Sequence, residues 1–333
     1  MAHFILLYCK LSIKMNDGII RMKRTKYVFD SIILWIENNI KEDIDVNDIV
    51  SKSGYSKRNV QYLFKKYLGY GIHTYVKNRR LSLSAKLLKI TKMPIIEICH
   101  IYHFNSYQSF NRAFKIKFGI PPARYRRAEN WLLSRYTGNA AIERPDMISR
   151  PVLLPCLEVK STNKEFKVNF CDGNYNNGKD EGNIAEIKRY VRTLVLNNKN
   201  GKKNNLMIIY RTDVCTKSNI TLNVTVFEVK DEPNDASLQR QTIGAGMYYL
   251  FHYEGTWEEY NSLSDYVYLN ELPMLNMNRR NAFDIEVYDI RAMREKTKLI
   301  VDLYVPVSPE LLESRSNLSG CKAKVTLKCF NEI

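Results

Sequence analysis

The stretch Ser53–Lys66 reads SGYSKRNVQYLFKK, and its apolar and polar residues recur at helical spacing directly after a glycine. Gly54 suits the left-handed conformation of a tight turn, and Ser56 can cap the helix that follows. The pattern predicts a helix over Lys57–Leu68. Its inward face would carry Val60, Leu63, Phe64 and Tyr67. Its outward stripe would carry Arg58, Gln61, Tyr62 and Lys65.

A second copy of this pattern follows 50 residues later in the chain. The matched positions are Phe64–Lys65 with Phe114–Lys115, Gly69 with Gly119, and Tyr75 with Tyr125. Ser106 would cap the second helix, Tyr107–Phe118, and its outward stripe would carry Gln108, Asn111, Arg112 and Lys115. Two copies of a helix-turn-helix explain the repeat.

Positive charge is concentrated around this repeat. The chain has a formal net charge of +16, and residues 52–127 hold 17 lysines and arginines against a single acid, Glu97. Such a field attracts polyanions and raises their association rate. The alternative is an ordinary solvated surface, but surfaces usually mix both signs.

The outward stripes carry the residue types that read DNA. Arginine pairs with guanine, glutamine or asparagine pairs with adenine, and lysine suits phosphate. One stripe alone would be an ordinary solvated helix face, whereas two capped copies in a region almost free of acids favour DNA. The predicted DNA-contact residues are Arg58, Asn59, Gln61, Tyr62, Lys65, Lys66, Gln108, Ser109, Asn111, Arg112 and Lys115.

The helical pattern extends over residues 26–130. The other predicted helices run from Val28 to Ile40 and over Asn47–Ser53, Arg79–Ile90, Ile95–Tyr102 and Ala123–Glu129. Residues 1–25 are predicted to be a disordered or spurious lead, and residues 131–151 to be a linker containing Gly138 and Pro145.

From Val152 the apolar pattern changes to a period of two residues, which predicts strands. The candidates are Val152–Val159, Phe166–Phe170, Leu206–Arg211, Thr221–Val229, Gly246–Tyr253, Ala282–Tyr288 and Leu299–Pro306. Helices are predicted over Gly182–Leu196 and Thr256–Leu269. The order is roughly β-α-β-β, twice, so the expected protein is multidomain: an all-α double helix-turn-helix domain, then an α+β domain over residues 152–333.

One predicted strand carries a candidate ligand group. Along Ala282–Tyr288, Asp284, Glu286 and Tyr288 would face one side, and Phe283, Ile285 and Val287 the other. A carboxylate among aromatic rings favours a cation through charge and π contact. The candidate ligand-binding residues are Glu286, Tyr288, Trp257 and Tyr249. The alternative is that Glu286 is solvated or paired with Arg279 or Arg280.

Other classes of site find little support in the sequence. The seven cysteines are scattered without zinc-ligand spacing, and no Ser/His/Asp arrangement or glycine-rich phosphate loop occurs. We therefore predict no catalytic residue, no metal and no cofactor. No apolar run approaches the length of a membrane span, and the cysteine usage fits a reducing cytosol.

Residues 28–127 resemble the DNA-binding domain of AraC/XylS-type transcriptional regulators, and among them the multiple-antibiotic-resistance activators. The matching stretches are SIILWIENN (Ser31–Asn39), SGYSKRNVQYLFKK and FKIKFGIPPARYR (Phe114–Arg126). The resemblance implies a monomer that inserts both recognition helices into successive major-groove segments of double-stranded DNA, with RNA polymerase as a partner. It also implies a location in the bacterial cytoplasm, on the nucleoid. The chain departs from the family at Arg58, where tryptophan is common, at Tyr62, where arginine is common, and at His103, where glycine is usual.

The second domain resembles the gyrase-inhibitor-like domain of Rob-like (right-origin-binding) regulators. The resemblance lies in GMYYLFHYEG (Gly246–Gly255) and LPMLNMNRRNAFDIEVY (Leu272–Tyr288). It implies a small hydrophobic, amphipathic or cationic effector, or a protein partner, and an activator of stress, efflux or antibiotic-resistance genes. Two alternatives stay open: a small-molecule hydrolase using a cleft carboxylate, and a nonspecific architectural DNA-binding protein.

Overall fold

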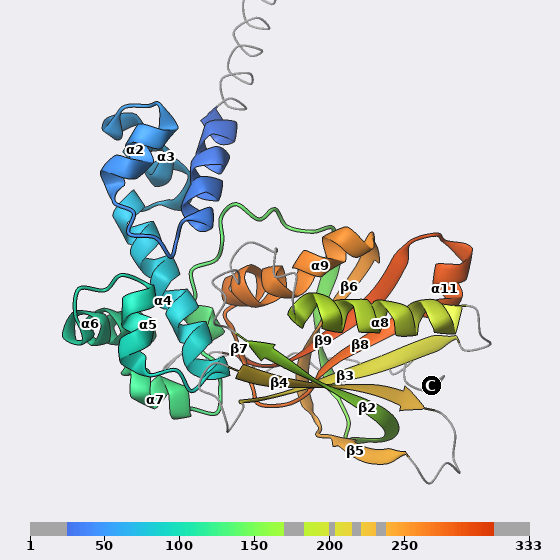
Figure 1. Ribbon diagram of the computed structural model, residues 1–333. Coiled ribbons are helices and arrows are strands. Elements are labelled where there is room, and N and C mark those ends of the chain that lie inside the picture. The colour runs from blue at the N-terminus through green and yellow to red at the C-terminus, as the bar shows by residue number, and fades with distance from the viewer. Residues whose placement is uncertain (1–24, 170–182, 200–203, 215–220, 231–237, 310–333) are drawn as a thin grey trace, which may run out of the picture. The chain divides into compact units, whose positions relative to one another are not determined.

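The computed structural model describes residues 25–169, 183–199, 204–214, 221–230 and 238–309 (Figure 1). The predicted lead lies outside this part of the chain apart from Thr25. The chain forms two compact units. The first extends to Arg80 and includes Asn139–Glu143, and the second contains Leu81–Gly138 and the chain from Arg144 onward.

The first unit holds the first helix-turn-helix. A helix over residues 25–38 precedes α2 (Val46–Ser53) and α3 (Lys57–Leu68). Gly54 ends α2 with φ 67°, and the Ser56 hydroxyl accepts the N–H of Asn59 at 3.3 Å to begin α3. These local signals fix the turn, because glycine adopts a left-handed conformation at no steric cost and serine satisfies a free helix N–H.

The second helix-turn-helix lies in the second unit and repeats this design. It contains α5 (Ile95–Ile101), α6 (Tyr107–Phe118) and α7 (Pro122–Arg127), and it follows the long helix α4 (Ile72–Ile90). The Ser106 hydroxyl accepts the N–H of Ser109 at 3.1 Å and begins α6. Gly69 and Gly119 close the two recognition helices with the same φ of 80°. The predicted 50-residue repeat is therefore confirmed.

Residue His103 stands in the second turn where Gly54 stands in the first. Its φ is 53°, so it adopts the left-handed conformation that a glycine would adopt more easily. The aromatic cores also correspond: Phe64 and Tyr75 are fully buried in the first copy, and Phe114 and Tyr125 in the second.

The rest of the second unit is a nine-stranded antiparallel sheet with helices. Its strands are β1 (Met147–Leu154), β2 (Leu157–Asn169), β3 (Asn205–Val214), β4 (Thr221–Lys230), β5 (Gln239–Ile243), β6 (Gly246–Gly255), β7 (Met277–Arg279), β8 (Asp284–Asp289) and β9 (Leu299–Pro309). Its helices are η1 (Leu133–Arg135), α8 (Asn183–Lys199), α9 (Trp257–Tyr266), η2 (Val267–Glu271), α10 (Leu272–Met274) and α11 (Ile290–Glu295).

The strand order β1-β6-β9-β8-β3-β4-β2-β5 contains an internal duplication. Strands β2, β3 and β4 with α8 form one β-α-β-β unit, and β6, β8 and β9 with α9 form the other. The two units meet where β3 pairs with β8. The strand that precedes each unit in the chain pairs with the edge of the other unit. Strand β1 precedes the first unit and pairs with β6 of the second, and β5 precedes the second unit and pairs with β2 of the first. The predicted α+β fold is confirmed.

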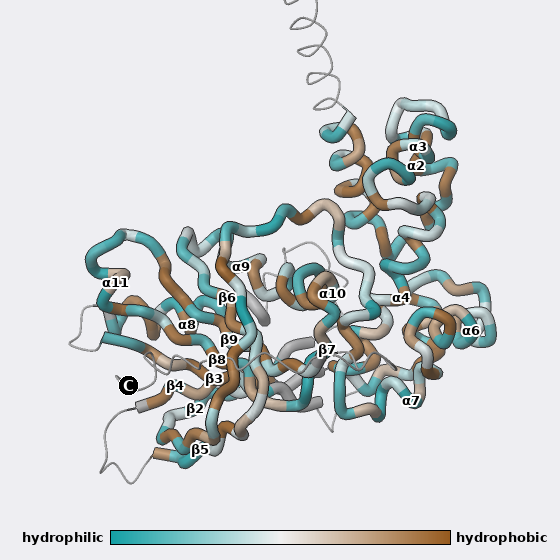
Figure 2. The backbone as a smooth tube through the Cα atoms, turned by 180° about the vertical axis from the view of Figure 1, so that it is seen from behind, coloured by the Kyte–Doolittle hydropathy of each residue, from teal (hydrophilic) through white to brown (hydrophobic). Residues whose placement is uncertain are grey.

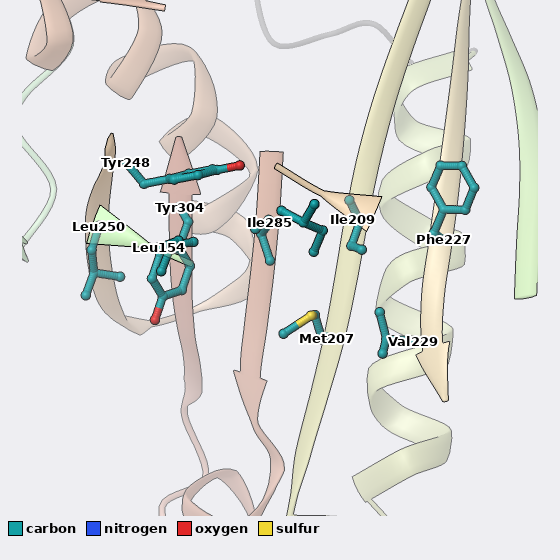
Figure 3. Close-up of a cluster of buried hydrophobic side chains, with 10 residues drawn as sticks. Leu154, Met207, Ile209, Phe227, Val229, Tyr248, Leu250, Ile285 and Tyr304 are labelled. Atoms are coloured by element: carbon teal, nitrogen blue, oxygen red, sulfur yellow. The ribbon is translucent and has the colours of Figure 1, made fainter. Parts of the chain in front are cut away.

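One face of the sheet carries a hydrophobic cluster to which most of the strands contribute (Figure 3). Its centre includes Met207, Ile209 and Ile285, all nearly inaccessible to solvent. Helices α8 and α9 lie along the opposite face (Figure 1). Hydrophobic stretches accordingly concentrate in the strands, and hydrophilic ones in the connections near α11 (Figure 2). Alternate residues of β8 thus face the cluster or the helices.

Two expectations about the start of this region are wrong. The predicted strand Val152–Val159 is two strands, because Pro155 has no N–H for a sheet and the chain breaks between β1 and β2. The predicted strand Phe166–Phe170 is, over its described residues 166–169, the end of the long β2, so only its predicted start is wrong.

The segment predicted as a linker packs against its surroundings. Leu133 and Tyr136 are buried, and β1 already begins at Met147. Its aromatic and apolar side chains account for this packing, which the glycine and proline content of the segment did not reveal. The predicted domain boundaries stay predictions.

Candidate DNA interface and effector cavity

The first recognition helix, α3, separates its two faces as predicted. Val60, Leu63 and Phe64 are buried. Phe64 packs edge-on against Phe29 at 5.4 Å and Tyr75 at 5.9 Å between ring centroids, which seats α3 on its neighbouring helices. The outer face exposes Arg58, Gln61, Tyr62, Lys65 and Lys66, with Asn59 half-buried. The polar stripe is thus available to a partner, and its base contacts stay predictions.

The second recognition helix, α6, presents a similar face. Phe110, Ala113, Phe114 and Phe118 are buried, whereas Gln108, Arg112 and Lys115 are exposed and Asn111 is half-buried. Ser109 is exposed, but its hydroxyl already donates to the Ser106 carbonyl at 2.8 Å and accepts the Ser106 N–H at 3.2 Å. A DNA contact by Ser109 would therefore compete with the helix cap.

Large apolar side chains also lie outward on these helices, and Tyr62 and Ile116 are the most exposed of them. Tyr62 is 57% exposed on α3, and Ile116 is 74% exposed on α6. Apolar side chains in a major groove contact the thymine methyl group. Ile116 was not among the predicted contact residues, because an isolated apolar residue in a basic helix gives no signal of its own in the sequence.

A cavity of about 220 Å³ lies in the sheet domain and contains three of the four candidate ligand residues. Glu286 and Tyr288 reach it from β8, and Trp257 from α9. The indole of Trp257 stacks on the ring of Tyr288 at 6.2 Å and 24°. The other described residues that line it are Ile187, Lys188, Val191, Tyr210, Val224, Tyr260, Asn261, Ser264, Tyr268, Asp284 and Leu303.

Glu286 sits in this cavity with three tyrosine partners. Its side chain accepts hydrogen bonds from the hydroxyls of Tyr210, Tyr260 and Tyr288, the last at 2.6 Å. Only 9% of the residue is exposed. Burial raises the pKa of the Glu286 carboxyl above its usual value, although the three tyrosine hydrogen bonds act in the opposite direction. The same burial raises the pKa of each tyrosine well above its ordinary range, so all three stay hydrogen-bond donors.

The second carboxylate of the cavity has a cation of its own. Asp284 lies 3.3 Å from the guanidinium of Arg279 and accepts the Tyr268 hydroxyl at 2.7 Å. The tyrosine partners of Glu286, in contrast, are neutral hydroxyls. The pairing with Arg279 that the sequence left open for Glu286 therefore belongs to Asp284.

Tyr249 is the candidate that the structure does not bring to the cavity. It lies on β6, where it packs against Phe251 at 5.3 Å, and β9 separates β6 from β8. Conversely, sequence reasoning missed Tyr210, Tyr260 and Tyr268. Helical spacing of Trp257, Tyr260, Asn261, Ser264 and Tyr268 was the available signal, since these residues recur at three and four along the predicted helix.

Two further properties of the described part of the chain concern metal-ligand groups and membrane-spanning helices. It contains no group of three or more histidine, cysteine or carboxylate side chains placed to hold a metal ion. None of its helices combines the length and the apolar character needed to cross a bilayer.

Comparison with known proteins supports both halves of this arrangement. Residues 49–128 match the model of a helix-turn-helix domain, and residues 164–308 match that of a GyrI-like small molecule binding domain. The F1 operon positive regulatory protein of Yersinia pestis is 31% identical over 267 residues, which cover 78% of this chain and 81% of that protein. The chain belongs to the AraC-type family of transcriptional regulators.

Other relatives of this AraC-type regulator match it over its DNA-binding half. The right-origin-binding protein of Escherichia coli is 38% identical over 104 residues, which cover 31% of this chain and 36% of that protein. The HTH-type transcriptional activator AarP of Providencia stuartii is 37% identical over 99 residues, 30% of this chain and 73% of that protein. The chain is thus a DNA-binding transcriptional regulator with a GyrI-like domain, the architecture of Rob-like regulators.

Proposed function

We propose that this regulator activates transcription by reading a bipartite DNA site as a monomer, with α3 and α6 in successive major-groove segments. The observation that carries the proposal is the repeated polar stripe on two capped helices of the same length. RNA polymerase is the proposed protein partner, because two relatives are named a positive regulatory protein and an activator. A nonspecific architectural role would not need side chains suited to base edges.

Selection of bound duplexes from a random pool tests the DNA proposal. The purified full chain, at physiological salt, should recover a motif with two half-sites about one helical turn apart. Binding that shows no motif and collapses as salt rises would instead indicate contacts to phosphate alone.

We further propose that the cavity binds a small aromatic cation as the effector. The carrying observation is that Glu286 is buried among aromatic rings with tyrosine hydroxyls as partners, while Asp284 is already paired with Arg279. A cation in the cavity would gain the charge of Glu286 and contact with the rings of Tyr260 and Tyr288. The Trp257 ring already has a cation over it, since the Arg192 guanidinium lies 5.7 Å from its centroid. A hydrolase would need Glu286 to accept a proton from water, and the three tyrosine hydroxyls leave about one acceptor position on its carboxylate for that water.

A pair of isosteric probes tests the charge preference. Benzyltrimethylammonium and neopentylbenzene have the same shape but differ by one positive charge, so titration calorimetry isolates the electrostatic contribution. The wild type should favour the cation by on the order of 10-fold to 30-fold, which corresponds to about 2 kcal/mol for a desolvated cation–π site. Glu286→Gln should lose this preference, and equal binding of both probes by the wild type would contradict the proposal.

The affinity for the cation should also depend on pH. The pKa of Glu286 is raised, and the cation stabilises the ionised carboxylate. Affinity should therefore be highest at pH values above this raised pKa and should fall as the pH drops through it. Neopentylbenzene provides the control, because its binding to the same cavity involves no charge and should stay constant over that range.

A further inference from the structure

The segment Trp131–Thr137 is attached to the sheet domain through β7. The Trp131 N–H donates to the Arg279 carbonyl at 2.8 Å, and the Arg279 N–H donates back to the Trp131 carbonyl at 3.0 Å. Ser134 adds two hydrogen bonds to the side chain of Asn278, from its N–H at 3.2 Å and from its hydroxyl at 2.8 Å. We call Trp131–Thr137 the connecting segment.

The C-terminal end of the connecting segment contacts the second helix-turn-helix. Lys117, in the last turn of α6, donates to the Thr137 hydroxyl at 2.8 Å. The Tyr136 ring packs edge-on against Phe118 at 5.7 Å, and its hydroxyl lies 3.1 Å from that of Tyr125 on α7. The Thr137 N–H also donates to Ser82 of α4 at 2.9 Å. The end of the second recognition helix is thus seated on this segment.

Arg279 joins the connecting segment to the cavity. Its guanidinium stacks over the Trp131 ring at 5.7 Å, and its Nε donates to the Tyr268 hydroxyl at 3.2 Å. Its Nη2 bonds Asp284 at 3.3 Å. Tyr268 and Asp284 both line the cavity, so one buried arginine touches the cavity wall and the segment that seats α6.

We propose that Arg279 is a positioning residue that transmits occupancy of the cavity to the second recognition helix through Trp131. This inference rests on the proposed function, because it assigns the cavity a regulatory role. A cation in the cavity is attracted to Asp284 and repels Arg279, so it weakens their ion pair. The guanidinium also donates to the carbonyls of Arg280 at 3.1 Å and Ala282 at 2.8 Å, and these bonds limit how far it moves. Any movement of Arg279 alters its stacking on Trp131 and therefore the seating of α6. The connecting segment is the element that the cavity, through Arg279, and α6 both contact.

Hydrogen exchange of the ligand-free full chain tests the route without any effector. Tyr268→Phe removes the hydroxyl between Arg279 and Asp284 but keeps the ring. We expect at least fivefold faster exchange in the connecting segment and in the C-terminal half of α6. Tyr260→Phe is the matched control, since it also removes a cavity hydroxyl bonded to a carboxylate, but that carboxylate is Glu286. Equal changes in both variants, or changes confined to residues 268–284, would overturn the proposal.

A second variant and a ligand separate the possible failures. Trp131→Phe keeps an aromatic ring but alters the stacking on Arg279. It should therefore also speed hydrogen exchange in the C-terminal half of α6, although it changes no residue of the cavity. Benzyltrimethylammonium should alter exchange in α6 of the wild type and not of Glu286→Gln. If the cation binds and α6 is unchanged, the coupling fails while the effector proposal stands. If the variants act on α6 but the cation does not bind, the effector class is wrong and the route stands.

Discussion

Replacing Glu37 by alanine should destabilise the first unit by about 3–5 kcal/mol, because it leaves a buried arginine without its counter-charge. The Glu37 carboxylate accepts three hydrogen bonds: from Nε of Arg79 at 2.8 Å, from Nη2 of Arg79 at 2.7 Å and from the Tyr75 hydroxyl at 2.6 Å. Glu37 is 5% exposed and Arg79 2% exposed, so water cannot replace the lost partner. Urea unfolding followed by circular dichroism would measure the loss.

Two matched variants make this prediction specific. Glu42→Ala removes an exposed carboxylate of the same unit and should change the free energy of unfolding by less than about 0.5 kcal/mol. The double replacement Glu37→Met with Arg79→Met removes both charges and should recover much of the stability, since buried ion pairs are often replaceable by apolar side chains. If the Glu37→Ala protein were as stable as the Glu42→Ala protein, the buried Glu37–Arg79 ion pair would not stabilise the first unit, and the prediction would be wrong.

The consequence for function is specific to one half-site. Tyr75 and Phe29 form the seat of α3 together with Phe64, and Tyr75 is hydrogen-bonded to Glu37. Loss of this ion pair should therefore weaken reading of the half-site assigned to α3 before it affects the one assigned to α6.

Removal of one predicted base-reading side chain per recognition helix should produce the largest direct loss of DNA affinity. Gln61→Ala on α3 and Arg112→Ala on α6 should each weaken binding to the selected duplex by about 1–3 kcal/mol. Both side chains are exposed on the outward stripes, so truncation should leave the fold intact. Each variant should relax sequence preference in its own half of the motif and leave the other half unchanged.

An exposed lysine outside the stripes provides the control for charge. Lys92→Ala, between α4 and α5, removes a positive charge as Arg112→Ala does. It should lower affinity for all duplexes uniformly and slightly, without changing the recovered motif. A uniform loss for Arg112→Ala as well would show that Arg112 contacts phosphate and not a base.

Both recognition helices were predictable to the residue. The helix α3 has the predicted bounds Lys57–Leu68 and α6 the predicted bounds Tyr107–Phe118. Their caps, Ser56 and Ser106, act on N–H groups three residues away, and the closing glycines lie next to the helix ends. These interactions are local in the chain, so composition and spacing report them directly.

The cavity was predictable only in part. The period of two along β8 placed Glu286 and Tyr288 on one face, because alternation is a property of a single strand. Tyr210 and Tyr260 come from β3 and α9, and their meeting at Glu286 depends on which strands are neighbours. The same strand order placed β9 between Tyr249 and the cavity. No local pattern encodes that order.

The sequence by itself determined the repeated helix-turn-helix, the basic region around it and the inward face of β8, since each depends on residues within one or two helical turns or on composition. Only the tertiary structure decided the Glu37–Arg79 pair, the tyrosine partners of Glu286 and the place of Arg279 between Asp284 and Trp131. The Glu37–Arg79 pair joins residues 42 positions apart, the Tyr210–Glu286 bond residues 76 positions apart, and the Arg279–Trp131 contact residues 148 positions apart. A charge or hydroxyl carries no record of such a distant partner. Desolvation, which raises the pKa of Glu286, likewise exists only once the strands and helices have closed around it.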